Sequence, residues 1–414
     1  IRVFSKGATQ MKKNKKKKWL KFRHRIVRNL LSITLGVYVR LKYRVKVQRF
    51  KNQEKRPYLI LMNHQTAFDQ FILGMAFKGP VYYLASEDLF SMGFTSSLIR
   101  HLVAPIPIKK QTTDVKAILN CIRVVKEGGT LAIAPEGNRT YSGKTEYMSP
   151  SIASLAKKLG IPVALLRIEG GYGVHPRWSD VVRKGKMRAY VSRVISPEEC
   201  KELSEDELFK VIEEGLYVNE ATDDATFKHK KLAEYLERAA YYCPHCGLST
   251  FKSKNDLITC QKCGMQVRYM PNKTLEGVGF DFPFKFYNDW YEAQADFTNS
   301  LNLLEYDSEP LYEERGDIYE VIPYKKKNLI CKDAKISLYG TKMEIVMGEE
   351  KKVFEFSETP YITLLGKNKL DIYSGDTIYQ IKSDERFNAL KYVHFYHRYK
   401  NLLKGDSNGK SSLD

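Results

Sequence analysis

The chain has 414 residues, 43% of them hydrophobic and 12% aromatic, so it is long and apolar enough to bury a large core and is not a disordered segment. Its formal net charge is +20, but residues 1–56 hold 20 Lys and Arg against one acidic residue, while the remainder holds 48 basic against 47 acidic residues. A globular nucleic-acid-binding protein would carry its basic excess on the folded body. The distribution therefore disfavours that class.

Residues 1–44 are predicted to form a basic, amphipathic, membrane-associating arm. Apolar residues recur there at helical spacing, at Trp19, Leu20, Phe22, Ile26, Leu30, Ile33 and Val37. The longest uncharged stretch, 29–39, has 11 residues, well short of the ~20 that cross a bilayer. We expect the arm to lie on an anionic membrane surface as a peripheral anchor. A nucleic-acid-binding arm or a solvated run of charge is the alternative.

From 45 to 240, short apolar segments alternate with helical ones. The expected strands lie at 57–62, 80–85, 104–108, 130–135, 161–168 and 187–195, and the clearest helices at 113–128 and 150–160. Alternation of this kind predicts an α/β domain with helices on both faces of a central sheet. Two charged segments, 198–218 and 228–240, are expected to be helices that close this domain.

Two Cys-x2-Cys pairs, separated by 13 residues, predict a small zinc ribbon at 241–272. The predicted metal ligands are Cys243, Cys246, Cys260 and Cys263. Four thiolates leave no open coordination position, so the Zn2+ would be structural. Redox use of the thiols is the alternative. Because the other three cysteines are scattered, we expect a reducing compartment, which places the protein on the cytoplasmic face of the cell membrane.

In the last third of the chain, the alternation of strands and helices gives way to a helical segment and then to a series of short strand-like segments. Residues 273–309 are expected to form a helical linker, and 310–404 a β-rich domain of seven or eight short strands followed by one helix. That succession is similar in shape to a pleckstrin-homology domain. The remaining residues, 405–414, are polar enough to predict a disordered tail.

The stretch NHQTAFD, 63–69, places His64 and Asp69 directly after an apolar strand. A neutral imidazole is suited to remove a proton, and a carboxylate can orient it, as in the serine-protease triad. Five positions along an ideal helix separate two side chains by roughly 140°. We therefore expect the two to meet only if the helix begins irregularly, with His64 on the preceding turn.

A second loop, PEGNRT at 135–140, also follows an apolar strand. It exposes Glu136, Asn138, Arg139 and Thr140 around a glycine turn, and arginine with turn amides is suited to bind phosphate. An ordinary strand-end turn is the alternative. Sites of α/β sheets gather where the strands end, so the two loops support each other. In the later segment GGYGVHPRW, His175 and Arg177 either line the same pocket or belong to a buried turn.

Asn-His-x4-Asp followed by Pro-Glu-Gly-x-Arg resembles the motifs of the glycerolipid acyltransferases, and in particular bacterial 1-acyl-sn-glycerol-3-phosphate (lysophosphatidate) acyltransferases. The resemblance covers roughly residues 45–200. It implies that a fatty acyl group passes from acyl-CoA or acyl-carrier protein to lysophosphatidate, giving phosphatidate. It assigns catalysis to His64 and Asp69.

The same resemblance assigns acceptor binding to Glu136 and Arg139 and places the family's third basic residue at Lys110. With Gly137, Asn138 and Thr140 of the exposed turn, these are the predicted substrate-binding residues. Lys110 and Ser86 differ from the residues usual in the family, which leaves another lysolipid or glycerol phosphate as an alternative acceptor. The sequence contains no Gly-x-Ser-x-Gly nucleophile elbow, so we expect direct transfer without an acyl-enzyme. A zinc-ribbon nucleic-acid-binding protein is the alternative from another class.

Overall fold

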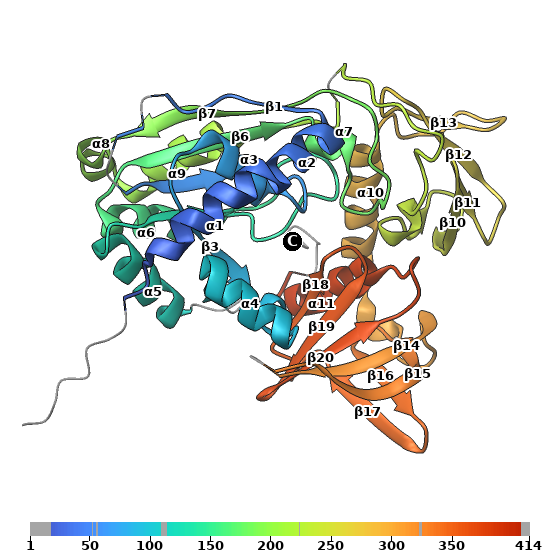
Figure 1. The fold of residues 1–414 in the computed structure, drawn as a ribbon. Helices are drawn as coiled ribbons and strands as arrows, with labels where there is room; N and C mark the ends of the chain where they lie inside the picture. The colour runs from blue at the N-terminus through green and yellow to red at the C-terminus, as the bar shows by residue number, and fades with distance from the viewer. Residues whose placement is uncertain are drawn as a thin grey trace, which may run out of the picture.

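The computed structural model describes residues 18–51, 53–54, 57–108, 114–222, 224–322 and 325–406. The α/β domain is built on a seven-stranded sheet of order β1-β7-β6-β2-β5-β3-β4 (Figure 1). Every neighbouring pair of strands is parallel except β6 and β7. Its strands are β1 (Val45–Val47), β2 (Leu59–Met62), β3 (Val81–Ser86), β4 (Ile106–Ile108), β5 (Thr130–Ile133), β6 (Val163–Glu169) and β7 (Met187–Ile195).

The helices of this part are α1 (Phe22–Ile33), α2 (Leu35–Tyr43), α3 (Asp69–Ala76), α4 (Phe94–Val103), α5 (Val115–Lys126), α6 (Ser151–Leu159), α7 (Gly171–Val174), α8 (Pro197–Glu202) and α9 (Glu205–Leu216). Within the described ranges, none of the helices combines the length and apolar character needed to cross a bilayer.

Helices cover both faces of the sheet, as the sequence predicts. Along β2, Leu59 and Leu61 join a core cluster with α5, α6 and α9, whereas Ile60 and Met62 join another with α3. Successive residues of a strand point to opposite faces, so a strand that is apolar throughout is buried from both sides. The expected strands of this domain are present, and so are the helices expected at 113–128, 150–160 and 198–218, the last of them divided into α8 and α9.

Two expectations about helices were wrong. The helical spacing of the N-terminal apolar residues fits one amphipathic helix, but the structure has two, because α1 ends at Ile33 and α2 begins at Leu35. The segment 228–240 contains only a short 3-10 turn, η2 (Leu236–Arg238). Its charged residues do not face solvent on a helix. Instead, Glu237 forms an ion pair with Arg386 and Arg238 forms one with Asp180, and both partners are remote in the sequence.

The cysteine module consists of a two-stranded hairpin, β8 (Tyr242–Cys243) with β9 (Gly247–Leu248), and a four-stranded antiparallel sheet. The strands of that sheet are β10 (Phe251–Lys254), β11 (Leu257–Cys260), β12 (Gln266–Tyr269) and β13 (Leu275–Gly277). Strand β13 pairs with β12, so the sheet extends into the predicted linker. The linker's helix is α10 (Tyr287–Ser300), followed by the 3-10 turn η3 (Leu303–Glu305).

The C-terminal domain is a second seven-stranded sheet, antiparallel and of order β17-β16-β15-β14-β20-β19-β18, closed by helix α11 (Ala389–Leu403). Its strands are β14 (Tyr312–Val321), β15 (Asn328–Leu338), β16 (Lys342–Met347), β17 (Glu350–Glu355), β18 (Tyr361–Leu365), β19 (Lys369–Ser374) and β20 (Thr377–Lys382). Of the seven or eight strands that the sequence predicts, the structure has seven, because 328–333 and 335–338, which read as two strands, form the single strand β15. Asp333, in the left-handed region at φ 52°, bends β15 without ending it.

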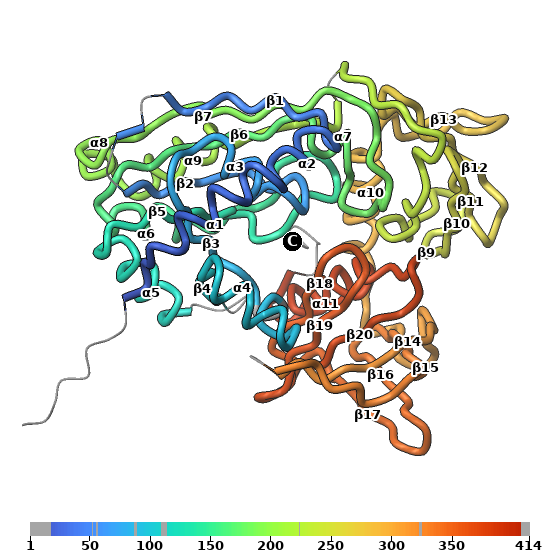
Figure 2. The backbone as a smooth tube through the Cα atoms, viewed as in Figure 1, coloured from blue at the N-terminus to red at the C-terminus, as the bar shows by residue number. Residues whose placement is uncertain are grey.

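The cysteine module, α10 and the C-terminal domain share one continuous hydrophobic core, which also takes in Tyr141 and Trp178 of the α/β domain. Figure 2 shows the chain passing from the cysteine module through α10 into the C-terminal sheet, beside the α/β domain. The C-terminal domain is therefore packed against the end of the sheet where the two motif loops follow β2 and β5, and its connection to the α/β domain is not limited to a linker.

Candidate active site

The side chains of His64 and Asp69 meet at the end of β2. Nδ1 of His64 lies 2.8 Å from a carboxylate oxygen of Asp69, which is the first residue of α3. His64 lies on the turn before the helix, so the irregular helix start that the spacing requires is present. With a carboxylate at Nδ1, the neutral ring carries its proton there and leaves Nε2 as the basic atom.

The carboxylate of Asp69 is fully buried and is held by several donors besides the imidazole. The backbone N–H groups of Gln65 and Thr66 donate to it at 2.8 and 3.0 Å, and the Thr66 hydroxyl donates at 2.7 Å. A buried carboxylate is stable only when its oxygens are paired in this way. These bonds fix the orientation of Asp69 and, through it, that of the imidazole.

Glu136 connects the two motif loops. One carboxylate oxygen accepts the backbone N–H of His64 at 2.8 Å, and the other accepts that of Glu146 at 2.9 Å. Burial raises the pKa of Glu136 to about 8, although these two hydrogen bonds oppose the rise. Thr140 adds a second bridge, because its N–H donates to the His64 carbonyl at 3.3 Å. Glu136 therefore braces the position of His64.

Arg139 is a buried cation with unused hydrogen-bonding capacity. Burial and the neighbouring Arg177 lower its pKa to about 10, so it stays charged at neutral pH. Within the described part of the chain, its Nη1 has no hydrogen-bond partner. A buried, unpaired guanidinium nitrogen is costly unless an anion completes it. Arg139 is therefore suited to bind an anionic ligand group.

These residues line a cavity of about 1600 Å³. A pocket for one drug-sized ligand measures roughly 300–1000 Å³, so the space suffices for two substrates. His64, Glu136 and Arg139 line it together with apolar side chains of α1, α4, α5 and β3. Part of its lining comes from β18 and α11 of the C-terminal domain.

The other predicted acceptor residues divide into three groups. Gly137, whose φ of +67° favours glycine, and Asn138 line the cavity, whereas the Thr140 hydroxyl accepts the N–H of Gly143 at 2.9 Å inside its own loop. Lys110 lies outside the described residues. His175 does not line the cavity: it is buried with its Nδ1 3.0 Å from the Tyr43 hydroxyl.

Sequence reasoning missed the contribution of the C-terminal domain to this cavity. Arg177 does line the cavity, and it also contacts the turn between β18 and β19. The segment 361–366 reads as an ordinary apolar strand, and no local pattern indicates which distant loop it will contact. In the sequence, the one indication was Arg177 in the GGYGVHPRW segment, which could be expected to line the same pocket.

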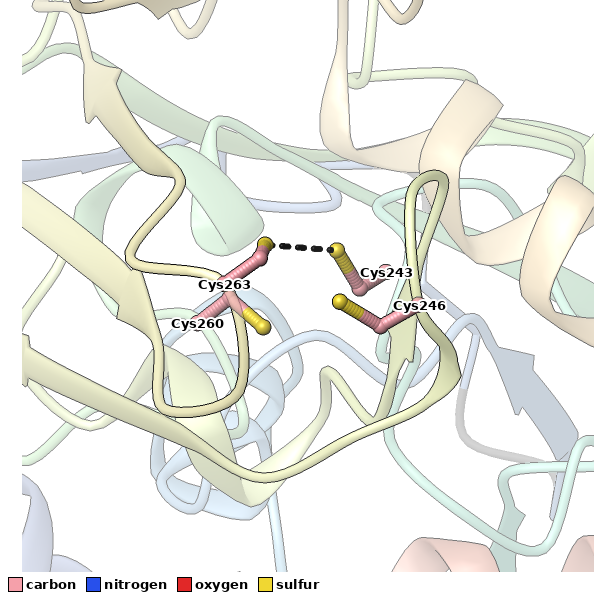
Figure 3. Close-up of side chains that lie close together, drawn as sticks. All are labelled: Cys243, Cys246, Cys260 and Cys263. Carbon is pink, nitrogen blue, oxygen red and sulfur yellow. Dashed lines mark hydrogen bonds between the residues drawn. The ribbon is translucent and has the colours of Figure 1, made fainter.

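A second cluster lies away from the cavity. The sulfur atoms of Cys243, Cys246, Cys260 and Cys263 all lie within 4.8 Å of one another and point into one space (Figure 3). The distance from Cys243 Sγ to Cys263 Sγ is 3.7 Å. Tetrahedral coordination with Zn–S bonds of ~2.3 Å places sulfur atoms about 3.8 Å apart. The donor set and its spacing therefore fit a four-thiolate metal site.

Comparison with known proteins bears on the first site. Residues 44–168 match the family model described as Acyltransferase. These residues form an acyltransferase domain. It includes His64, Asp69, Glu136 and Arg139 and ends before Arg177. This region resembles the glycerolipid acyltransferases, as its two motifs indicate.

Two curated relatives carry related names. The acyltransferase region is 23% identical over 202 residues to the chloroplastic 1-acyl-sn-glycerol-3-phosphate acyltransferase BAT2 of Brassica napus, covering 47% of this chain and 56% of that protein. It is 24% identical over 188 residues to the 1-acyl-sn-glycerol-3-phosphate acyltransferase of Bacillus subtilis (strain 168), covering 44% and 89%. The chain spans about half the length of the chloroplastic relatives that it matches.

A solved structure is also similar to the acyltransferase region. The crystal structure of the 1-acyl-sn-glycerophosphate (LPA) acyltransferase PlsC from Thermotoga maritima is 25% identical and covers 47% of this chain and 78% of its own, with a TM-score of 0.40.

Proposed function

We propose that the protein transfers a fatty acyl group from a thioester donor to the free hydroxyl of lysophosphatidate, giving phosphatidate. The observation that carries this proposal is that His64, 2.8 Å from the buried Asp69, lines the same cavity as Arg139, whose Nη1 has no hydrogen-bond partner among the described residues. A base can remove the proton of an acceptor hydroxyl, and an anion-binding group can hold the phosphate of the same molecule.

In the proposed reaction, Nε2 of His64 removes the proton of the acceptor hydroxyl as its oxygen attacks the thioester carbonyl carbon. The new C–O bond gives a tetrahedral intermediate, and Asp69 stabilises the imidazolium that forms. The C–S bond then breaks, and the departing thiolate takes up the proton held by His64. The ester and the free thiol balance the equation without an acyl-enzyme.

Arg139 is proposed to bind the acceptor phosphate. Its Nη1 is buried, charged and without a partner among the described groups. A phosphate oxygen would satisfy it with a charge-assisted hydrogen bond. Acyl-CoA or acyl-carrier protein is proposed as the donor, and both deliver the acyl group as a thioester.

Attachment to the cytoplasmic face of the cell membrane is proposed to run through α1, α2 and α4. The apolar face of the two N-terminal helices is turned outward: Phe22 is 75% exposed, and its exposed companions are Ile26, Leu30, Ile33, Val37 and Leu41. Next to α1, helix α4 presents Phe94, which is 83% exposed. Exposed apolar side chains on a basic segment favour an anionic lipid surface.

We propose that Cys243, Cys246, Cys260 and Cys263 hold a structural Zn2+, so that the module is a zinc ribbon. The ion would fix the two Cys-x2-Cys turns relative to each other. The C-terminal domain is proposed to be of the pleckstrin-homology type, which is supported by its seven antiparallel strands and closing helix.

The decisive experiment measures acyl transfer by the purified full chain on vesicles. Lysophosphatidate and a panel of other lysolipids and glycerol 3-phosphate are offered with acyl-CoA and with acyl-carrier protein in parallel. We expect phosphatidate from lysophosphatidate as the main product. Preferred acylation of another acceptor would replace the proposed substrate, and no transfer to any acceptor would refute the activity.

A further inference from the structure

The C-terminal domain contacts the acyltransferase domain at its anion-binding loop. The guanidinium of Arg177 donates from Nη1 to the carbonyl of Arg139 at 2.8 Å and from Nε to the carbonyl of Gly366 at 2.8 Å. Gly366 lies in the turn between β18 and β19. The buried side chain of Arg177 therefore connects the backbone that carries Arg139 to a turn that lies 189 positions after Arg177 itself.

Other contacts hold the same turn. Tyr141, two residues after Arg139, donates its hydroxyl to the carbonyl of Lys367 at 3.0 Å, and the Arg177 guanidinium stacks on its ring at 4.4 Å. Lys367 forms an ion pair with Asp180. A planar guanidinium donates to two carbonyls in fixed directions while its face lies on a ring, whereas an ammonium group is a compact point charge without that fixed fork. The contact therefore favours arginine over lysine.

The same domain closes part of the cavity. Ile362 and Leu364 of β18 line it, together with the α11 residues Leu390, Val393 and His397. The α11 residues are three and four positions apart, so they form one face of the helix. This face and the His64 loop border the same space.

We propose that the C-terminal domain is part of the acceptor site, with Arg177 as the positioning residue that holds Arg139 against the β18–β19 turn and the α11 face as a wall around the bound acceptor. The proposal deepens the acyl transfer proposed above and rests on it. The ligand concerned is a single-chain lipid with a phosphate headgroup, bound through Arg139 and enclosed by β18 and α11.

The first test is Arg177→Lys in the full chain, with Arg188→Lys as the matched control. Arg188 is an exposed arginine of the same domain that pairs with Glu169 and does not line the cavity. Losing one or two hydrogen bonds from Arg177 should raise KM for lysophosphatidate roughly 5- to 30-fold while leaving KM for the acyl donor near the wild-type value. A merely structural role would change kcat and both KM values alike, or neither.

The second test is Val393→Trp, with Leu403→Trp as the control on the same helix. Leu403 is exposed and does not line the cavity. A tryptophan at 393 should fill acceptor space and raise the acceptor KM, whereas Leu403→Trp should behave as wild type. Unchanged acceptor KM in both Arg177→Lys and Val393→Trp, with the wild type active, would overturn the inference.

A readout that needs no turnover separates this inference from the proposed reaction. Arg177→Lys should speed backbone hydrogen exchange in residues 136–141 and in the 364–368 turn together, and Arg188→Lys should not. If the wild type acylates no acceptor, the proposed function fails, and exchange still decides whether Arg177 couples the turn to the loop. Unaltered exchange in both segments would refute the coupling.

Discussion

The carboxylate of Asp69 is completely buried, whereas the imidazole of His64, 2.8 Å away, keeps 26% of its side-chain surface exposed to the cavity. The carboxylate is thus enclosed by protein, and the imidazole reaches the cavity. His64→Ala is expected to lower kcat at least ~100-fold with an unchanged melting temperature, measured by acyl-transfer assay and thermal unfolding. Near-normal turnover in this variant would rule out the catalytic role.

Asp69→Asn is expected to reduce kcat strongly while leaving the acceptor KM within a few-fold of wild type. The amide retains one acceptor oxygen, but its NH2 group faces the N–H groups that the carboxylate accepts, so His64 loses its fixed tautomer. Thr66→Val, which removes the hydroxyl that donates to Asp69 and accepts the Phe68 N–H but keeps the carboxylate, is the milder control. Equal loss in the control and in Asp69→Asn would indicate a role in folding instead.

Arg139→Ala is expected to raise KM for lysophosphatidate roughly 10- to 100-fold, because a charge-assisted hydrogen bond to phosphate is lost. The donor KM should stay unchanged, since a group that binds a non-reacting phosphate acts on the acceptor alone. Steady-state kinetics with each substrate varied in turn measure both values. A donor effect of the same size would move Arg139 to the thioester side of the cavity.

Glu136→Gln is expected to flatten the dependence of stability on pH. The pKa of Glu136 is about 8 in the folded state against an ordinary value of 4.5, so the folded protein binds more protons than the unfolded chain between these values. The stability linked to this group is complete below pH 4.5 and is lost as the pH rises through about 8.

The glutamine cannot titrate, although losing one acceptor oxygen should cost about 1–3 kcal/mol at every pH. Melting temperatures from pH 5 to 8.5 should therefore fall less steeply for the variant than for the wild type. Parallel curves would show that Glu136 does not titrate in this range.

The purified protein is expected to contain about one zinc ion per chain by elemental analysis. Cys263→Ser should lose the metal and destabilise the cysteine module, because a small ribbon has little core without its ion. Cys331→Ser is the control, since Cys331 lies in the C-terminal sheet outside the cluster. A metal-free wild type with an ordered module would refute the zinc site.

Ile26→Asp and Phe94→Asp are expected to weaken sedimentation with anionic vesicles, and Val353→Asp, which changes an exposed apolar residue of β17, is not. The wild-type interaction should fall with added salt, since the Debye length is about 8 Å at physiological ionic strength. Equal binding to neutral and anionic vesicles by every variant would exclude this surface as the membrane contact.

The α/β part of the fold could be predicted because its signals are local. A strand that is apolar throughout, such as Leu59–Met62, indicates burial on both faces without reference to distant residues. His64 and Asp69 are also close in sequence, and they meet within one turn. The segment 228–240 could not be predicted, because the same charges that stabilise an exposed helix here pair with Arg386 and Asp180, which are remote in sequence. The contact of Arg177 with Gly366 depends on tertiary structure in the same way.

The order in which the ribosome makes this chain follows from the position of the β18–β19 turn. Gly366 is synthesised 189 residues after Arg177. At about 5–20 residues per second, the turn is made roughly 10 to 40 s after Arg177, and helix α11 follows it. During that interval the nascent protein has His64, Asp69 and its outward apolar helices but lacks one side of the cavity. A premature stop before α11 would therefore leave a truncated chain with both motifs of the acyltransferase domain and an incomplete cavity.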